Sequence, residues 1–295
     1  MTKALRFLAI CTISVVFATL SIASAQTYTS IDFPGAVSTT LNGGPNPQGT
    51  SVGSWFDGTN THGYTLTAKG VFTSFDPPGS ISTTPDFISP QGVIVGGFND
   101  ASNVSHGFIL NGSTFTTIDN PFGQPGTVLT GLNPSGEMSG FSCAVASCAN
   151  GTFHSFTVSK KGVFASFDPP GAISSTASTV NPSGAVVGAY TDSGGVGHGY
   201  LLDKNGTFTT IDFPGATSTF AGGNNPEGNI IGEYNDTAGV GHSFLLSNGV
   251  FTSFDPSFTG VTVIFSDASG INPGGVIVGI YFDSAFKEHG YIRTP

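Results

Sequence analysis

The chain repeats one short pattern six times, at intervals of about 44 residues, from Thr27 to its last residue. Each copy contains an aromatic-rich segment that ends in Asp, followed later by a single His. A fixed period of this length is typical of one supersecondary unit stacked on its neighbours. The aspartates are Asp32, Asp76, Asp119, Asp168, Asp212 and Asp255, and the histidines, which are all that the chain has, are His62, His106, His154, His198, His242 and His289.

Glycine, proline and asparagine divide each copy into four short segments, which we predict to be strands. The first is the aromatic segment, as in Thr207–Asp212, and the second ends in an Asn-Pro-x-Gly turn, as at Asn181–Gly184. The third is apolar with an internal Gly, which lets neighbouring backbones approach closely. The fourth opens with the His and leads through a Gly loop into the next aromatic segment, so these two strands are expected to form a hairpin.

The aromatic strands carry apolar side chains on both faces, as Phe208 and Ile211 show, which is typical of a sheet packed between two others. The repeat region begins on an aromatic strand (Tyr28–Ile31) and ends on a His strand (His289–Arg293), so the first strand can complete the last sheet. We therefore predict an all-β fold, a six-bladed β-propeller of four-stranded repeats over residues 26–295, closed by pairing of the N- and C-terminal strands. A β-solenoid is the alternative.

Residues 1–25 have the pattern of a signal peptide that is removed on export. Lys3 and Arg6 precede an apolar stretch, Phe7–Ile22, and Ala23-Ser24-Ala25 forms a small-residue cleavage site. We expect a secreted protein, extracellular or periplasmic, with no membrane span after signal removal.

The remaining chain is acidic and sparsely charged. Without Lys3 and Arg6, six basic residues face eighteen acidic ones, and only 9% of the sequence is charged. This balance disfavours nucleic acid and anionic lipid surfaces as partners. The 43 glycines could suggest disorder, but 26 phenylalanines at regular positions indicate a packed core.

Two cysteines, Cys143 and Cys148, occur in the third copy only. In an exported protein we expect them to form a disulfide that closes a small loop. A redox or metal-binding pair is the alternative.

An Asp precedes the His by five or six residues in every copy but the third, which makes these residues candidates for a binding site on one rim. Carboxylate and imidazole could bind a transition metal, and Asp with Asn neighbours could bind calcium. The other interpretation, which a feature used once per repeat favours, is that each Asp fixes a turn and each His fixes the hairpin. We expect the aspartates that end the aromatic strands to cap turns in the same way. We predict no metal site and no cofactor, and bound calcium is the one alternative. The rim candidates are Asp57 and His62, Asp100 and His106, Asp192 and His198, Asp236 and His242, and Asp283 and His289.

The order of motifs resembles the bacterial extracellular HAF repeat family. Phe208–Ala216, Asn181–Gly184, Val187–Asp192 and His198–Leu202 carry the resemblance, which covers the whole mature chain. The resemblance implies secretion and a propeller-like all-β fold. It assigns no activity to this chain and carries over no catalytic residues.

The sequence thus favours a non-enzymatic secreted module that binds a glycan, a small ligand or an envelope protein, or that scaffolds an envelope assembly. The alternative is a secreted glycan hydrolase or lyase with acidic residues at the mouth of the channel. Two non-repeated carboxylates, such as Glu137 and Glu233, lying in one cleft with an aromatic platform would favour the enzyme.

Overall fold

The structure is a computed structural model that describes residues 26–122, 124–148 and 152–295, and every regular element in these ranges is a β-strand. The predicted signal peptide, residues 1–25, lies outside the described residues. In the part of the chain that is described, no helix is long and apolar enough to cross a membrane.

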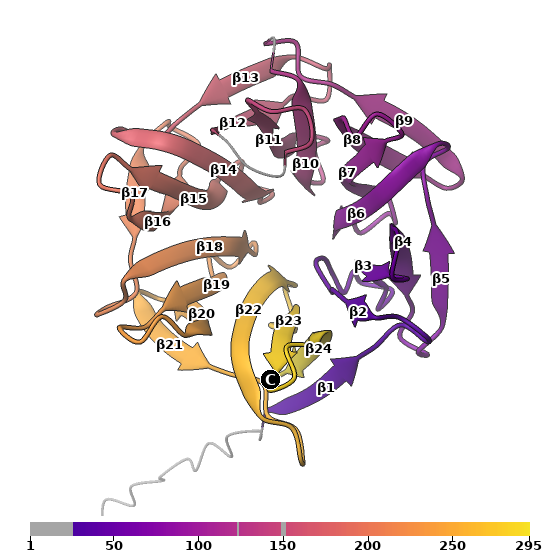
Figure 1. The fold of residues 1–295 in the computed structure, drawn as a ribbon. Coiled ribbons are helices and arrows are strands. Elements are labelled where there is room, and N and C mark those ends of the chain that lie inside the picture. Colours follow the sequence, from indigo (N-terminus) through magenta and orange to yellow (C-terminus); the bar gives the residue numbers. More distant parts are fainter. Residues whose placement is uncertain (1–25, 123, 149–151) are drawn as a thin grey trace, which may run out of the picture.

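The strands are arranged around a central axis, and each copy of the repeat runs from the axis to the perimeter (Figure 1). The strands nearest the axis are β2 (Ser38–Thr39), β6 (Ser80–Ile88), β10 (Gly126–Leu132), β14 (Ala172–Val180), β18 (Ser218–Asn224) and β22 (Val263–Ile271). The second strands are β3 (Ser51–Phe56), β7 (Ile94–Asp100), β11 (Met138–Cys143), β15 (Val186–Asp192), β19 (Ile230–Asn235) and β23 (Ile277–Asp283).

The third strands carry the histidines, and the aromatic strands form the perimeter. The third strands are β4 (Thr61–Leu66), β8 (Ser105–Asn111), β12 (Phe153–Val158), β16 (Gly197–Leu202), β20 (Gly241–Ser247) and β24 (Glu288–Thr294). The outer strands are β5 (Phe72–Phe75), β9 (Thr114–Ile118), β13 (Phe164–Phe167), β17 (Phe208–Ile211), β21 (Val250–Phe254) and β1 (Thr27–Ile31).

The predicted all-β propeller arrangement is confirmed, whereas the predicted six separate four-stranded sheets are not what the structure contains. Four sheets have four strands, and the strands β2 to β9 form a single eight-stranded sheet. The reason is one parallel bridge between Thr61 of β4 and Ser82 of β6, which joins two antiparallel groups of four strands. The predicted pairing of the chain ends is present, because β1 pairs with β24 from Thr27↔Thr294 to Ile31↔Gly290.

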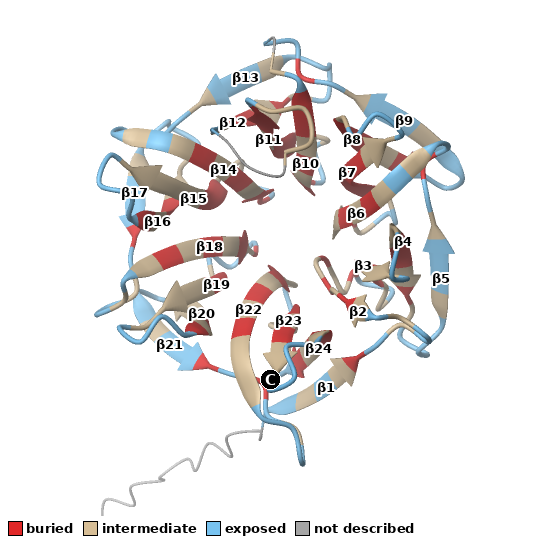
Figure 2. Ribbon diagram, viewed as in Figure 1, coloured by how far each residue is buried: buried red, intermediate tan, exposed pale blue. Residues whose placement is uncertain are grey.

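The core lies between neighbouring copies of the repeat. Each third strand contributes one fully buried aromatic ring, from Tyr64 in β4 to Tyr291 in β24. These rings pack on side chains from the adjacent copy, so that Val52 of β3, for example, shares a cluster with Ile88 and Phe108. Burial is concentrated on the inner strands, while much of the perimeter is exposed (Figure 2). Each copy is therefore stabilised mainly by its two neighbours.

The internal Gly of each second strand is required by close packing, as predicted. A Cβ at Gly188 would collide with the carbonyl oxygen of Thr176 on the inner strand, and a Cβ at Gly279 would collide with that of Asp267. Next to this contact five of the inner strands contain a β-bulge, where one residue is left out of the pairing register, and in the first copy Asn42, beyond the end of β2, has the same place. These residues, which we call the bulge residues, are Asn42, Asp86, Thr130, Ser178, Gly222 and Ser269.

Candidate functional site

Every histidine is held by the aspartate that ends an outer strand. His62 Nδ1 lies 2.7 Å from Asp76 Oδ2, and His289 Nδ1 lies 2.7 Å from Asp32 Oδ1, which joins the two ends of the chain. The same bond has lengths of 2.8 to 2.9 Å in the other copies. These aspartates were expected to cap turns, and the structure shows that their main role is to fix the His ring.

The predicted rim aspartates lie on the other side of the same rings. In the five copies that have one, a carboxylate oxygen lies 3.4 to 3.6 Å from the His Nε2. The second oxygen accepts two backbone N–H bonds from its own turn, as Asp192 does from Gly194 and Val196. These backbone bonds lower the pKa of the rim aspartates Asp57, Asp100, Asp192, Asp236 and Asp283.

We call each such Asp–His–Asp arrangement a bracket. An aromatic ring covers the His in the same five copies, as Tyr281 covers His289 with ring centroids 4.8 Å apart. At His62, burial alone would lower the pKa, but the hydrogen bonds and charges of Asp76 and Asp57 outweigh it and raise the pKa. The bracket ties the loop between the second and third strands to the outer strand, so its polar groups already have partners.

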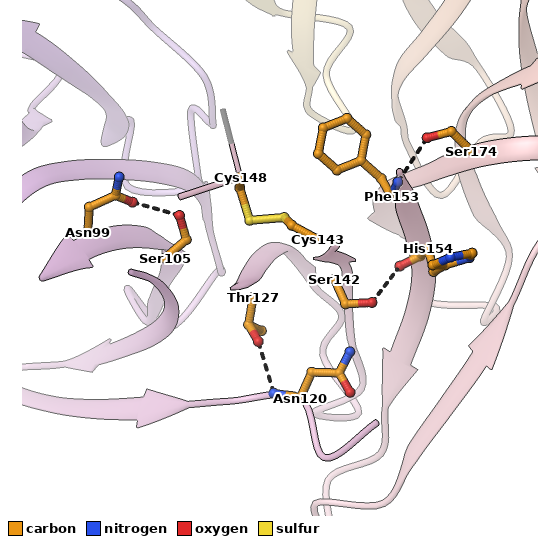
Figure 3. Close-up of a disulfide and its surroundings, with 10 residues drawn as sticks. All are labelled: Asn99, Ser105, Asn120, Thr127, Ser142, Cys143, Cys148, Phe153, His154 and Ser174. Atoms are coloured by element: carbon orange, nitrogen blue, oxygen red, sulfur yellow. Dashed lines mark hydrogen bonds between the residues drawn. A yellow bond between two sulfur atoms is a disulfide. The ribbon is translucent and has the colours of Figure 1, made fainter. Parts of the chain in front are cut away.

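The third copy has no complete bracket. Among the described residues the His154 ring bonds only Asp168, at 2.9 Å, and the residue paired opposite it is Ser142 instead of an aromatic. Cys143 and Cys148 form the predicted disulfide in this loop (Figure 3). In the loop between the second and third strands, this copy thus has a disulfide where the other copies have a turn stabilised by Asp.

The brackets bring the predicted rim residues together in pairs, one pair in each of five copies, and not into one shared site. Among the described residues, no group of three His, Cys, Asp or Glu side chains converges as a potential metal site. The geometry of each bracket is that of side chains that hold a loop against the outer strand of a hairpin, which is the structural interpretation that the repeat favoured.

The side chains that do converge lie on the axis. The bulge residues, which we call the waist, sit where two cavities in the central channel adjoin, because Asn42, Asp86 and Ser269 line both. Five of the six waist residues carry a side-chain oxygen, the exception being Gly222. Unlike the brackets, the waist differs from copy to copy.

One cavity, of about 280 Å³, contains the waist together with Phe141, Thr176 and Asp267. The other, of about 140 Å³, leads from the waist past the Asn-Pro-x-Gly turns and is lined by their prolines and asparagines. Those asparagines bond across neighbouring copies, as Asn133 Nδ2 does to the carbonyl of Asn181 at 3.3 Å and Asn225 Nδ2 does to that of Asn272. The channel is therefore polar at the waist and more apolar toward the turns.

Asp86 is the most unusual group in the channel. Its Oδ2 atom is enclosed and has no hydrogen-bond partner. Burial raises the pKa of Asp86 to about 8, so the side chain is mostly protonated at neutral pH. Burial also raises the pKa of Asp267 to about 6, although a backbone N–H bond from Ala268 opposes the shift. The cavity thus holds one neutral carboxyl and one carboxylate at neutral pH.

Of the two glutamates singled out from the sequence, only Glu233 has an electrostatic link to this region. Burial raises the pKa of Glu233 to about 8, and the charge of Asp267 adds to the shift. Glu137 instead accepts a bond from Asn133 Nδ2 at 3.2 Å, in a turn. Sequence reasoning missed Asp86 and Asp267. The signal was available, because the other copies carry Asn, Thr, Ser or Gly where Asp86 stands, and Thr, Val or Phe where Asp267 stands.

Comparisons with known proteins show the fold alone. No family model and no curated protein matches the chain. Among solved structures, a putative TolB from Agrobacterium tumefaciens has a TM-score of 0.55 at 12% identity, covering 92% of this chain and 99% of that one. The six-bladed propeller lectin of Aleuria aurantia has a TM-score of 0.53 at 13% identity, with coverage of 86% and 91%. Virginiamycin B lyase from Staphylococcus aureus has a TM-score of 0.51 at 10% identity, with coverage of 92% and 100%.

Proposed function

We propose that this protein is an exported, non-enzymatic binding module that takes a small polyhydroxylated ligand, of the glycan class, at the waist of its channel. The observation that carries the proposal is the buried Oδ2 atom of Asp86, which has no hydrogen-bond partner and lies at a cavity whose other walls offer hydroxyl and amide groups. Pockets with a few convergent polar groups and a residue of shifted pKa are typical binding sites.

The chemistry of the waist fits a sugar better than it fits an ion. A protonated Asp86 both donates and accepts a hydrogen bond, as a sugar hydroxyl does. Thr176 and Ser178 add further hydroxyl groups, and Phe141 offers an aromatic surface. The lectin from Aleuria aurantia was solved for its fucose recognition, so glycan binding occurs on a fold of this kind.

The test is a titration of the mature protein with a panel of neutral mono- and disaccharides, followed by calorimetry. Asp86→Asn should weaken the best ligand about tenfold or more, because the carboxyl is replaced by an amide of the same size. Asp203→Asn is the matched control, since Asp203 accepts backbone bonds in an exposed turn and lines neither of the two channel cavities. Ser178→Phe, which fills the waist, should abolish binding. A panel without any ligand, or unchanged affinity in Asp86→Asn, would contradict the proposal.

One observation favours a second candidate, a glycan hydrolase or lyase. A protonated Asp86 and an ionised Asp267 in one cavity resemble the acid and base pairing that glycoside chemistry uses. Release of reducing sugar or an unsaturated product, lost in both Asp86→Asn and Asp267→Asn, would support the enzyme over the binding module.

We further propose that the eight-stranded sheet acts as two blades, which gives six blades around the axis. The single bridge between Thr61 and Ser82 supports this, because both halves otherwise have the same four-stranded order as the separate sheets. We also propose membership of the HAF repeat family and export, which the repeat and the disulfide support.

A further inference from the structure

The two ends of the channel open on faces of very different chemistry. Because the strands of each copy are antiparallel, the loops alternate between the faces. One face contains the loops that join the second strand to the third and the outer strand to the next inner strand. These loops carry the brackets, and we call this face the histidine face. The other carries the Asn-Pro-x-Gly turns and the loops from third to outer strand, and we call it the proline face.

More of the exposed large apolar side chains lie on the histidine face than on the proline face. Of the eleven large apolar residues that are exposed among the described residues, eight lie in or beside its loops, and Phe286 is the most exposed, at 79%. The proline face has the other three, Val71, Val163 and Val250. Groups of exposed apolar residues mark interaction sites more often than isolated ones do. The eight are Val37, Ile81, Phe122, Ile173, Val196, Val240, Val261 and Phe286.

The charge around these side chains indicates what covers them. The ten bracket aspartates and Asp168 of the third copy all lie on the histidine face, and their side chains are 25 to 56% exposed. The one lysine in its loops is Lys287, which lies 3.5 Å from Asp32. Four lysines (Lys69, Lys160, Lys161 and Lys204) are instead in loops of the proline face.

We propose that the histidine face docks a basic polypeptide segment that also carries apolar side chains. The eight apolar side chains supply surface that a partner can bury, and the aspartates on the same face favour Lys and Arg on that partner. A second copy of this chain is a poor occupant, because its proline face offsets the four lysines with Glu137, Asp203 and Glu227. This site is separate from the channel, so it does not depend on the sugar proposal.

The test uses the mature protein and a fluorescent amphipathic peptide of leucine and lysine, with binding measured by anisotropy. Val37→Ser/Val196→Ser/Val240→Ser should weaken binding about tenfold or more. Val71→Ser/Val163→Ser/Val250→Ser makes the same change at valines of the proline face that are more exposed than the three of the histidine face, and it should change binding less than about threefold. Thermal melting confirms that both triple variants stay folded.

Two further arms separate specific docking from charge attraction alone. Asp119→Asn/Asp212→Asn removes charge from two of the most exposed bracket aspartates and should weaken binding several-fold, as should raising NaCl from about 50 to about 500 mM. A peptide with glutamate in place of lysine should not bind. Equal losses in the two valine variants, binding of the glutamate peptide, or no binding of the lysine peptide would overturn the proposal.

Discussion

The brackets and the waist are both sets of polar side chains repeated around the axis, but they differ in how regular they are and in how completely they are hydrogen-bonded. Each bracket repeats almost unchanged, and each of its groups has a partner, as Asp255 does in His242 and Ser266. The waist changes residue type from copy to copy and leaves a carboxyl oxygen of Asp86 without a partner. Repetition with full hydrogen bonding indicates a structural role, whereas broken symmetry with an unmet polar atom indicates a role for a ligand.

The largest effect should come from breaking a bracket that also reaches the core. Asp255 accepts bonds from His242 and from the buried Ser266, so Asp255→Ala removes two charged hydrogen bonds and leaves the Ser266 hydroxyl with only its contacts to Ser243. We expect a loss of about 2 to 3 kcal/mol of unfolding free energy, or about 5 to 10 °C in Tm. Asp212→Ala, where the partner is only His198, is the control and should cost clearly less in a thermal melt.

The third copy offers the next test, because a disulfide stands where the other copies have the rim Asp. Cys143→Ser/Cys148→Ser should cost about 2 kcal/mol, from the closure of a small loop. The loss should appear in denaturant unfolding of the oxidised protein and vanish under reducing conditions. Equal stability of wild type and variant in oxidising buffer would show that this loop needs no closure.

The waist should respond to mutation with the opposite sign. Because the folded-state pKa of Asp86 is raised to about 8, the unfolded state releases the proton first as pH rises. The wild type therefore loses stability relative to Asp86→Asn between about pH 4 and pH 8. Below that range the two proteins should have the same free energy of unfolding. The stability advantage of the variant over the wild type should therefore grow steadily with pH across this range. A constant difference across this range would contradict the enclosed carboxyl.

The smallest effect should come from the rim aspartates. Asp192→Ala removes two backbone bonds in an exposed turn and one long contact to His198. We expect a small decrease in Tm, smaller than the loss of the disulfide, with Asp192→Asn retaining most of the stability. Because the folded-state pKa of Asp192 is lowered, its contribution is present at neutral pH and is lost on acidification through that pKa.

The sequence could predict the strands, the turns, the pairing of the chain ends and the disulfide, because each depends on local residue patterns or on the repeat. It could associate Asp192 with His198, which are close along the chain, but not His198 with Asp212, the closer contact. That bond depends on the register between a third and an outer strand. The sequence does show that Asp86 departs from the other copies, but not that it lines the channel, which depends on the bulge in β6. The joining of two strand groups by one bridge at Thr61 has no signal in the sequence.

The most direct test is the titration of the Asp86 carboxyl itself, followed by ¹³C NMR and assigned by its absence in Asp86→Asn. An enclosed carboxyl without a hydrogen-bond partner should titrate with a midpoint of about 8 in the free protein. A midpoint of about 4, the ordinary value for aspartate, would show a hydrated side chain and would remove the basis for a ligand site at the waist.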